Sequence, residues 1–140
     1  AWVVAANQIP VKLSSMFLSA TSNPYVFLLI VNILLLIVGM FMETGAAIIL
    51  LAPILAPIAV KLGIHPLHFG FMMVLNLAIG MATPPVGVCL FVSCGITGLS
   101  LERVSAASMR FVAALLGVLL LVTYVAPISL FLPKMLGFIR

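Results

Sequence analysis

The distribution of charged residues constrains this chain more than any other feature of its sequence. Among 140 residues only six are Lys or Arg and two are Asp or Glu, and they leave charge-free stretches at 13–42, 44–60, 62–101 and 111–133. A soluble domain carries about a quarter charged residues, which cover its surface. A bilayer core about 30 Å thick needs about 20 apolar residues per helix. The charge-free stretches therefore predict an all-α polytopic membrane protein with roughly four to five segments of membrane depth.

Composition excludes several classes of function. The chain is 66% hydrophobic and 6% charged, which is incompatible with a soluble enzyme or a nucleic-acid-binding module. Its net charge of +4 suits lipid headgroups and membrane topology and does not indicate nucleic acid. The sequence offers no nucleophile–base pair and no metal triad, so we expect no enzyme. It starts Ala1-Trp2-Val3, without an initiator Met or a charged segment, and we expect the C-terminal part of a larger protein.

Apolar runs and helix breakers divide the chain into four parts. Residues 1–23 form an amphipathic portion, 24–62 a helical hairpin, 66–98 a discontinuous helix, and 99–140 a loop followed by a final span. The helices are expected at 24–42, 46–61, 67–80, 88–97 and 105–130, with a charged loop at 98–103. His65 and His68 are expected in an interfacial turn, and Cys89 and Cys94 as buried thiols.

The double proline at Pro84 and Pro85 is the most informative motif. Neither residue has an N–H, so the carbonyls of Gly80 and Met81 lose their helical donors. In hydrocarbon such a break survives only where it is buried in protein or lines a cavity. The carbonyls and the Thr83 hydroxyl are hard oxygen ligands of the kind that bind Na⁺, and discontinuous helices build cation sites in secondary transporters. The alternative is a structural kink satisfied by a neighbouring helix.

Glu43 is the only charged residue between Lys12 and Lys61. If both arms of the hairpin cross the membrane, it lies in an ordinary interfacial loop. If the hairpin is re-entrant, its tip stops near the midplane and Glu43 is an intramembrane acid, which indicates function. Gly39 and Gly45 favour a tight tip, but the two readings are equally compatible with the sequence.

The hairpin tip also has electrostatic consequences. The first arm ends there and exposes carbonyls that attract cations, whereas the second arm begins there and exposes N–H groups that favour anions. Glu43 or Thr44 can cap the second arm. One tip thus offers adjacent positions for a cation and an anion, as cation-coupled uptake of carboxylates requires.

A series of motifs in one order resembles a known family. The motifs are Gly39-Met40-Phe41-Met42-Glu43-Thr44, Ala46-Ala47-Ile48-Ile49-Leu50, Pro53-Ile54-Leu55-Ala56-Pro57-Ile58, Gly63-Ile64 with Pro66, His68-Phe69-Gly70, and Gly80-Met81-Ala82-Thr83-Pro84-Pro85-Val86-Gly87. Together they resemble the C-terminal part of the large membrane subunit of TRAP (tripartite ATP-independent periplasmic) transporters, in the ion transporter superfamily. His65 departs from the family, which more often has Asp in this turn.

The resemblance implies an elevator-type transporter half in the bacterial inner membrane. Its mobile transport domain would hold the re-entrant hairpin 24–62 and the discontinuous helix 66–98. Residues 1–23 and the final helix of 99–140 would belong to the scaffold. The implied function is Na⁺-coupled symport of small organic anions such as C4-dicarboxylates, sialic acid or other sugar acids. The implied partners are the remaining half of the permease, a small four-helix membrane subunit, a periplasmic substrate-binding protein and membrane lipid.

In this family context the hairpin tip and the helix break share one site. We expect Na⁺, the only cofactor, to be bound by Gly39, Met42, Thr44, Gly80, Thr83 and Pro84. We expect the organic anion next to it, beside Glu43, Gly45, Ala82, Pro85, Val86 and Gly87. The alternative function is a non-transporting membrane scaffold or assembly subunit, in which the helix breaks serve packing alone.

Overall fold

The computed structural model describes residues 23–137 of the chain, and this part is helical. Its elements are α3 (Pro24–Phe41), α4 (Thr44–Lys61), α5 (Pro66–Met81), α6 (Val88–Thr97), α7 (Leu101–Tyr124) and α8 (Ala126–Met135). The predicted all-α class is confirmed for these residues. The amphipathic portion predicted at 1–23 lies, except for Asn23, outside the described residues.

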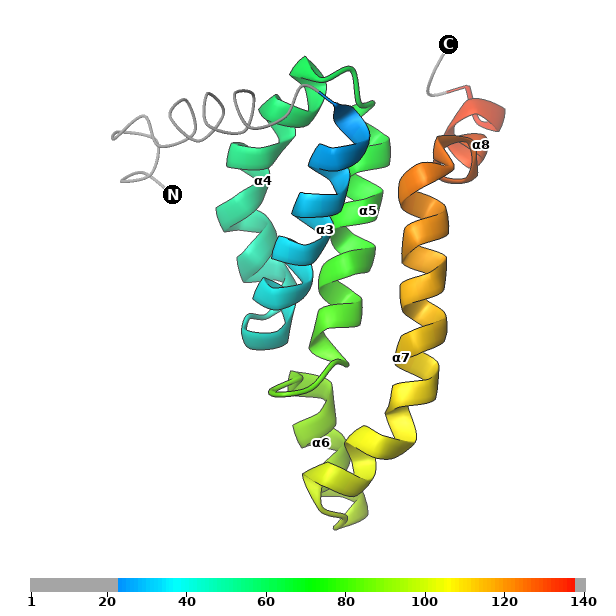
Figure 1. Cartoon of the computed structure of the whole chain (residues 1–140). Coiled ribbons are helices and arrows are strands. Elements are labelled where there is room, and N and C mark those ends of the chain that lie inside the picture. Colours follow the sequence, from blue (N-terminus) through cyan, green and yellow to red (C-terminus); the bar gives the residue numbers. More distant parts are fainter. Residues whose placement is uncertain (1–22, 138–140) are drawn as a thin grey trace.

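Helices α3 and α4 form the predicted hairpin (Figure 1). Helix α3 begins where the Asn23 side chain accepts the Tyr25 N–H at 3.0 Å, with Pro24 in the first turn. Helix α4 continues through Pro53 and Pro57 to Lys61. It begins two residues before the predicted start, at Thr44, because Glu43 caps it.

The double proline interrupts the next helix as predicted. Helix α5 ends at Met81 and α6 begins at Val88, and the residues between them are not helical. Figure 1 shows the tip of the hairpin at the level of this interruption, with α6 extending beyond it. The hairpin is therefore shorter than the body formed by α5, α6 and α7.

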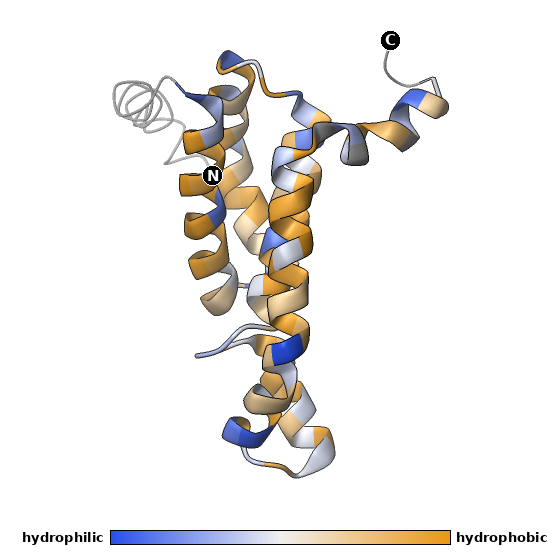
Figure 2. Ribbon diagram, turned by 45° about the vertical axis from the view of Figure 1, so that its right-hand side comes forward, coloured by the Kyte–Doolittle hydropathy of each residue, from blue (hydrophilic) through white to orange (hydrophobic). Residues whose placement is uncertain are grey.

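The C-terminal part differs from the prediction in two ways. Helix α7 starts at Leu101, inside the predicted loop 98–103, because Glu102 in its first turn is favoured by the helix dipole. The single span predicted at 105–130 is two helices, and Figure 2 shows α8 turning away from the end of α7. Pro127 has no N–H for the carbonyl of Thr123, four residues earlier.

The side chain of His68 forms a hydrogen bond with the Thr123 carbonyl instead. Its Nε2 lies 3.2 Å from the Thr123 oxygen, which can only accept, so Nε2 donates; its Nδ1 lies 2.6 Å from Ser129 Oγ in α8. His68 is thus a buried residue of α5, and the interfacial turn predicted for it is wrong, whereas His65 does lie in the turn and caps α5. Burial was also wrongly predicted for Cys89, which is exposed, while Cys94 is half-buried.

Three of the described helices, α3, α4 and α7, are long and apolar enough to cross a membrane. Hydrophobic residues cover their outward faces as well as their inward ones (Figure 2). On α3, for example, Ile33 and Ile37 are more than half exposed. Helices that are apolar all round are stable only in a large core or in lipid. These are the properties of a polytopic membrane protein.

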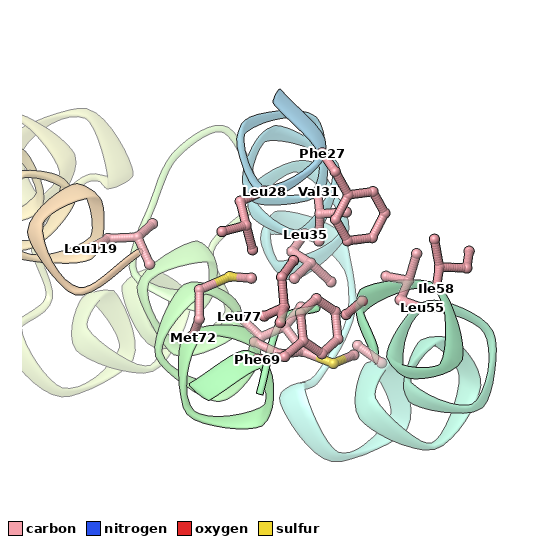
Figure 3. Packing of buried hydrophobic residues seen from close by; sticks show 14 of the residues in the cluster. Phe27, Leu28, Val31, Leu35, Leu55, Ile58, Phe69, Met72, Leu77 and Leu119 are labelled. Atoms are coloured by element: carbon pink, nitrogen blue, oxygen red, sulfur yellow. The ribbon is translucent and has the colours of Figure 1, made fainter. Parts of the chain in front are cut away.

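The core lies between the hairpin and α5. Figure 3 shows side chains from α3, α4 and α5 interdigitating there, with Leu119 of α7 at the side. Phe27 and Phe69 stack with ring centroids 6.4 Å apart, at the end of this core away from the hairpin tip. Helix α5 is therefore enclosed by the hairpin on one side and by α7 on the other.

Close to the tip, α3 and α5 approach until their backbones touch. A Cβ atom on Gly80 would lie 2.8 Å from the Cα atom of Gly39, and one on Gly39 would lie 2.9 Å from the Leu77 carbonyl oxygen. Small residues allow such contact between membrane helices. This crossing sets how close the hairpin tip comes to the α5–α6 break.

We predict that Gly80→Ala destabilises the fold by about 1–3 kcal/mol, because the added methyl group meets backbone atoms that cannot move aside. Gly70→Ala, on the same helix, is the matched control, since its methyl group would have no neighbour within 4 Å among the residues that the structure describes. Thermal unfolding of both variants in detergent checks the prediction. Equal tolerance of the two substitutions would contradict the close crossing.

Candidate functional site

The hairpin tip and the helix break are in direct contact. The Gly87 N–H, at the end of the break, donates to the Met40 carbonyl at 3.2 Å. Thr44 Oγ1, at the start of α4, lies 2.8 Å from Met81 Sδ, at the end of α5. With the Gly39–Gly80 crossing, these contacts join the two segments that the sequence predicts to be functional.

Thr83 is a buried polar residue at the break, 8% exposed. Its hydroxyl donates to the Ile79 carbonyl at 2.7 Å, and its N–H donates to the Gly80 carbonyl at 2.9 Å. The Gly80 carbonyl, which Pro84 deprives of its helical donor, is thus satisfied by a tight turn. The hydroxyl proton of Thr83 is engaged, so the oxygen still presents lone pairs to a cation.

Gly87 closes the break and begins α6. Its φ of +53° is a left-handed conformation that favours glycine, and a Cβ atom there would lie 3.0 Å from the Thr83 carbonyl oxygen. The chain between Thr83 and Gly87 therefore folds back on itself. Within this turn Pro84 and Val86 are half-buried and Pro85 is exposed.

Glu43 is the N-cap of α4. Its two carboxylate oxygens accept the N–H groups of Gly45 and Ala46 at 2.8 and 2.9 Å. Of the two caps that the sequence allows, Glu43 and Thr44, the structure has Glu43. The carboxylate thus occupies donors that were expected to attract a substrate anion.

Four helix ends meet around this contact. Helices α3 and α5 both end here, at Phe41 and Met81, whereas α4 and α6 both begin here, at Thr44 and Val88. Helix C-termini carry partial negative charge and N-termini partial positive charge. Glu43 neutralises the start of α4, but no side chain among residues 23–137 caps the start of α6. The site can therefore attract a cation at two helix ends and an anion at one.

The structure brings together some of the predicted site residues. Gly39 meets Gly80, and Thr44 and Gly87 contact Met81 and Met40. The sequence had pointed to the Met81 carbonyl only as one freed by the prolines, and Met40 was not among the predicted site residues. Both methionines lie inside the quoted motifs, but only the folded structure shows which backbone and sulfur atoms face the partner segment. The other predicted residues, Met42, Gly45 and Ala82, lie on the same turns, with Met42 as the C-cap of α3 and Ala82 as the C-cap of α5.

Comparison with known protein families shows which family has this sequence. Residues 1–128 match the tripartite ATP-independent periplasmic transporter, DctM component. The chain belongs to the DctM family of TRAP transporters. The resemblance inferred from its motifs is therefore confirmed.

Curated members of the DctM family are similar over nearly the whole chain. The C4-dicarboxylate TRAP transporter large permease protein DctM of Pseudomonas aeruginosa is 47% identical over 137 residues, which are 98% of this chain and 32% of the relative. The sialic acid TRAP transporter large permease protein SiaM of Vibrio cholerae is 40% identical, over 96% of this chain and 31% of the relative. The isethionate TRAP transporter permease protein DctMQ of Oleidesulfovibrio alaskensis is 45% identical, over 92% of this chain and 20% of the relative. The chain thus spans a third or less of the length of these relatives.

The capping role of Glu43 leads to a prediction. Glu43→Ala should lower the midpoint of thermal unfolding, because it removes both acceptors from the start of α4. Glu43→Gln keeps one acceptor oxygen and removes the charge, so it should lie between Glu43→Ala and the wild type in thermal unfolding. Equal stability of the wild type and Glu43→Ala would contradict the cap.

Proposed function

We propose that this chain is part of a Na⁺-coupled permease that imports small organic anions across the bacterial inner membrane. The observation that carries the proposal is the contact between the hairpin tip and the α5–α6 break. The carbonyl-bearing ends of α3 and α5 meet there inside an apolar bundle, where their oxygens have lone pairs but no water to contact. A bound cation is a natural partner for such oxygens.

The Na⁺ ion would lie between the ends of α3 and α5. Both helices direct the negative ends of their dipoles to this position. Thr83 adds a hydroxyl oxygen whose proton is already donated to the Ile79 carbonyl. Carbonyl and hydroxyl oxygens suit hard cations, whereas the sulfur atoms of Met42 and Met81 do not, so these would act through their backbones.

The organic anion would lie at the start of α6, beside Pro85, Val86 and Gly87. This helix start has no side-chain cap within the described part of the chain, and its N–H groups therefore favour a carboxylate. Glu43 already satisfies the start of α4, so we place Glu43 in the site as a structural anion rather than as a substrate ligand. Cation and anion would then be neighbours, which favours their binding together.

An elevator mechanism with a re-entrant hairpin fits the relative lengths of the elements. The hairpin tip lies at the level of the break, and α6 extends beyond it toward the loop before α7 (Figure 1). In a membrane crossed by α7, the tip would stop inside the bilayer. The hairpin and the discontinuous helix would move as the transport domain, while the rest of the permease supplies the second half of the site.

Substrate class and partners are inferred from the relatives. The similar permeases are named for C4-dicarboxylates, sialic acid and isethionate, which are all small organic anions. We infer the same class for this chain, together with a small membrane subunit and a periplasmic substrate-binding protein. A TRAP permease transports its substrate and does not transform it, so we propose no enzymatic activity.

Thr83→Val tests the ion site in the intact permease. It keeps the shape of the side chain and deletes one oxygen, so the Na⁺ concentration for half-maximal uptake should rise roughly 5- to 150-fold. Thr83→Ser keeps the hydroxyl and is the matched control, with a half-saturating Na⁺ concentration close to that of the wild type. In Thr83→Val the affinity for substrate should fall only through its coupling to Na⁺. It should therefore recover at high Na⁺ concentration, because coupling between two sites is reciprocal.

The opposite result has a clear meaning. If Thr83→Val accumulates in the membrane and its uptake has an unchanged dependence on Na⁺, the break is a packing kink. Uptake by the wild-type permease tests the alternative of a non-transporting scaffold. If the chain is such a scaffold, the wild type shows no Na⁺-dependent uptake.

A further inference from the structure

Three buried polar side chains join α3, α5 and α7 away from the proposed ion site. Asn32, Asn76 and Thr123 are 5%, 0% and 2% exposed. Asn76 Nδ2 donates to the Asn32 carbonyl at 2.9 Å and to Asn32 Oδ1 at 2.7 Å. Asn32 Nδ2 in turn donates to Thr123 Oγ1 at 2.9 Å. These bonds cross the interior of an otherwise apolar core.

We propose that Asn32 and Asn76 are positioning residues that fix the register of α3 against α5 and thereby hold the hairpin tip on the helix break. The consequence for Na⁺ binding rests on the proposed function, but the consequence for the register does not. The pair lies about 10 Å along α3 from Gly39, two helical turns away, and about one turn along α5 from Gly80.

Apolar packing alone specifies register poorly in a membrane. Lipid tails are as apolar as leucine, so a slipped α3 would exchange one set of apolar contacts for another at little loss. A slip by one residue moves the helix by about 1.5 Å and turns its side chains by about 100°. It would separate Asn76 Nδ2 from both of its acceptors at once. A single buried Asn fixes register in coiled coils for the same reason.

Thr123 strengthens this assignment by orienting the Asn32 amide. Its hydroxyl donates to the Leu119 carbonyl at 2.7 Å, so it can only accept from Asn32. The Asn32 Nδ2 group must therefore face α7, which leaves Oδ1 directed at Asn76. Thr123 of α7 thus fixes the orientation of the Asn32 amide, and Asn76 of α5 donates to the oxygen that this orientation presents.

The stability of the folded state does not account for an asparagine at position 76. Its Oδ1 is buried and accepts no hydrogen bond within the described residues, which is unfavourable for the folded state. Leucines at both 32 and 76 would avoid this unsatisfied acceptor without leaving the Asn32 amide oxygen unpaired. An asparagine at this position therefore points to specificity of alignment as its role.

The test follows the contact between tip and break through disulfide formation between cysteines at 44 and 81. Thr44 Oγ1 lies 2.8 Å from Met81 Sδ, so the thiols of Thr44→Cys and Met81→Cys should meet through small movements of the chain and cross-link in the full-length permease with Cys89 and Cys94 replaced by Ala. Asn76→Leu in this background should slow cross-linking about threefold to tenfold, because two interhelical hydrogen bonds no longer hold the register. An unchanged rate would overturn the proposal.

Phe69→Leu is the matched control. Phe69 lies on the same helix and packs against α3, so this substitution weakens the interface without removing a polar contact. It should leave the rate of cross-linking close to the original. Equal slowing by Phe69→Leu and Asn76→Leu would show that general packing sets the alignment, which would also overturn the proposal.

A second variant covers the case in which Asn76→Leu does not accumulate. Asn32→Leu removes one acceptor but keeps the bond from Asn76 to the Asn32 carbonyl, so cross-linking should slow only about threefold. An unchanged rate in Asn32→Leu would then be the contradicting result.

The Na⁺ dependence of uptake, measured without the added cysteines, separates this inference from the ion site. Asn76→Leu should raise the half-saturating Na⁺ concentration and Phe69→Leu should not. If Asn76→Leu slows cross-linking and leaves the Na⁺ dependence unchanged, the register assignment stands and the ion-site proposal fails.

Discussion

The contact between the backbones of Gly39 and Gly80 determines how the rest of the described structure is arranged. It brings the ends of α3 and α5 side by side, close enough for the Gly87 N–H to reach the Met40 carbonyl. Any larger residue at either glycine would separate the two helices. The hydrogen bond between Gly87 and Met40 and the convergence of four helix ends depend on this approach.

Proline residues beyond the first turn of a helix create the other main constraint, because each leaves a carbonyl without its helical donor. The structure satisfies two of these carbonyls by different means. The Gly80 carbonyl accepts the Thr83 N–H in a tight turn, whereas the Thr123 carbonyl accepts His68 Nε2 from a neighbouring helix. The first arrangement opens the helix near the hairpin tip, and the second redirects the chain from α7 into α8.

The sequence was sufficient for the features that depend on local chemistry. Charge-free runs and the double proline predict the hairpin and the break between α5 and α6, because these follow from hydrophobic length and missing N–H groups. The family was indicated by the resemblance of the ordered motifs. The split between α7 and α8 was missed. Pro127 alone does not show that His68, 55 residues from Thr123 in the sequence, donates to the Thr123 carbonyl. The Asn32–Asn76 pair was also missed, although isolated polar residues in apolar runs are a signal for it. Pairings between helices depend on three-dimensional register, which a single sequence does not contain.

The central claim is that the hairpin tip and the break form one Na⁺ site, and the thermal stability of the intact permease tests it most directly. A ligand that binds the folded state alone stabilises it by an amount that grows with its concentration, about 2.7 kcal/mol at one hundred times its dissociation constant. The midpoint of unfolding should therefore rise as NaCl replaces KCl at constant ionic strength. Identical midpoints in the two salts would contradict a Na⁺ site at this contact.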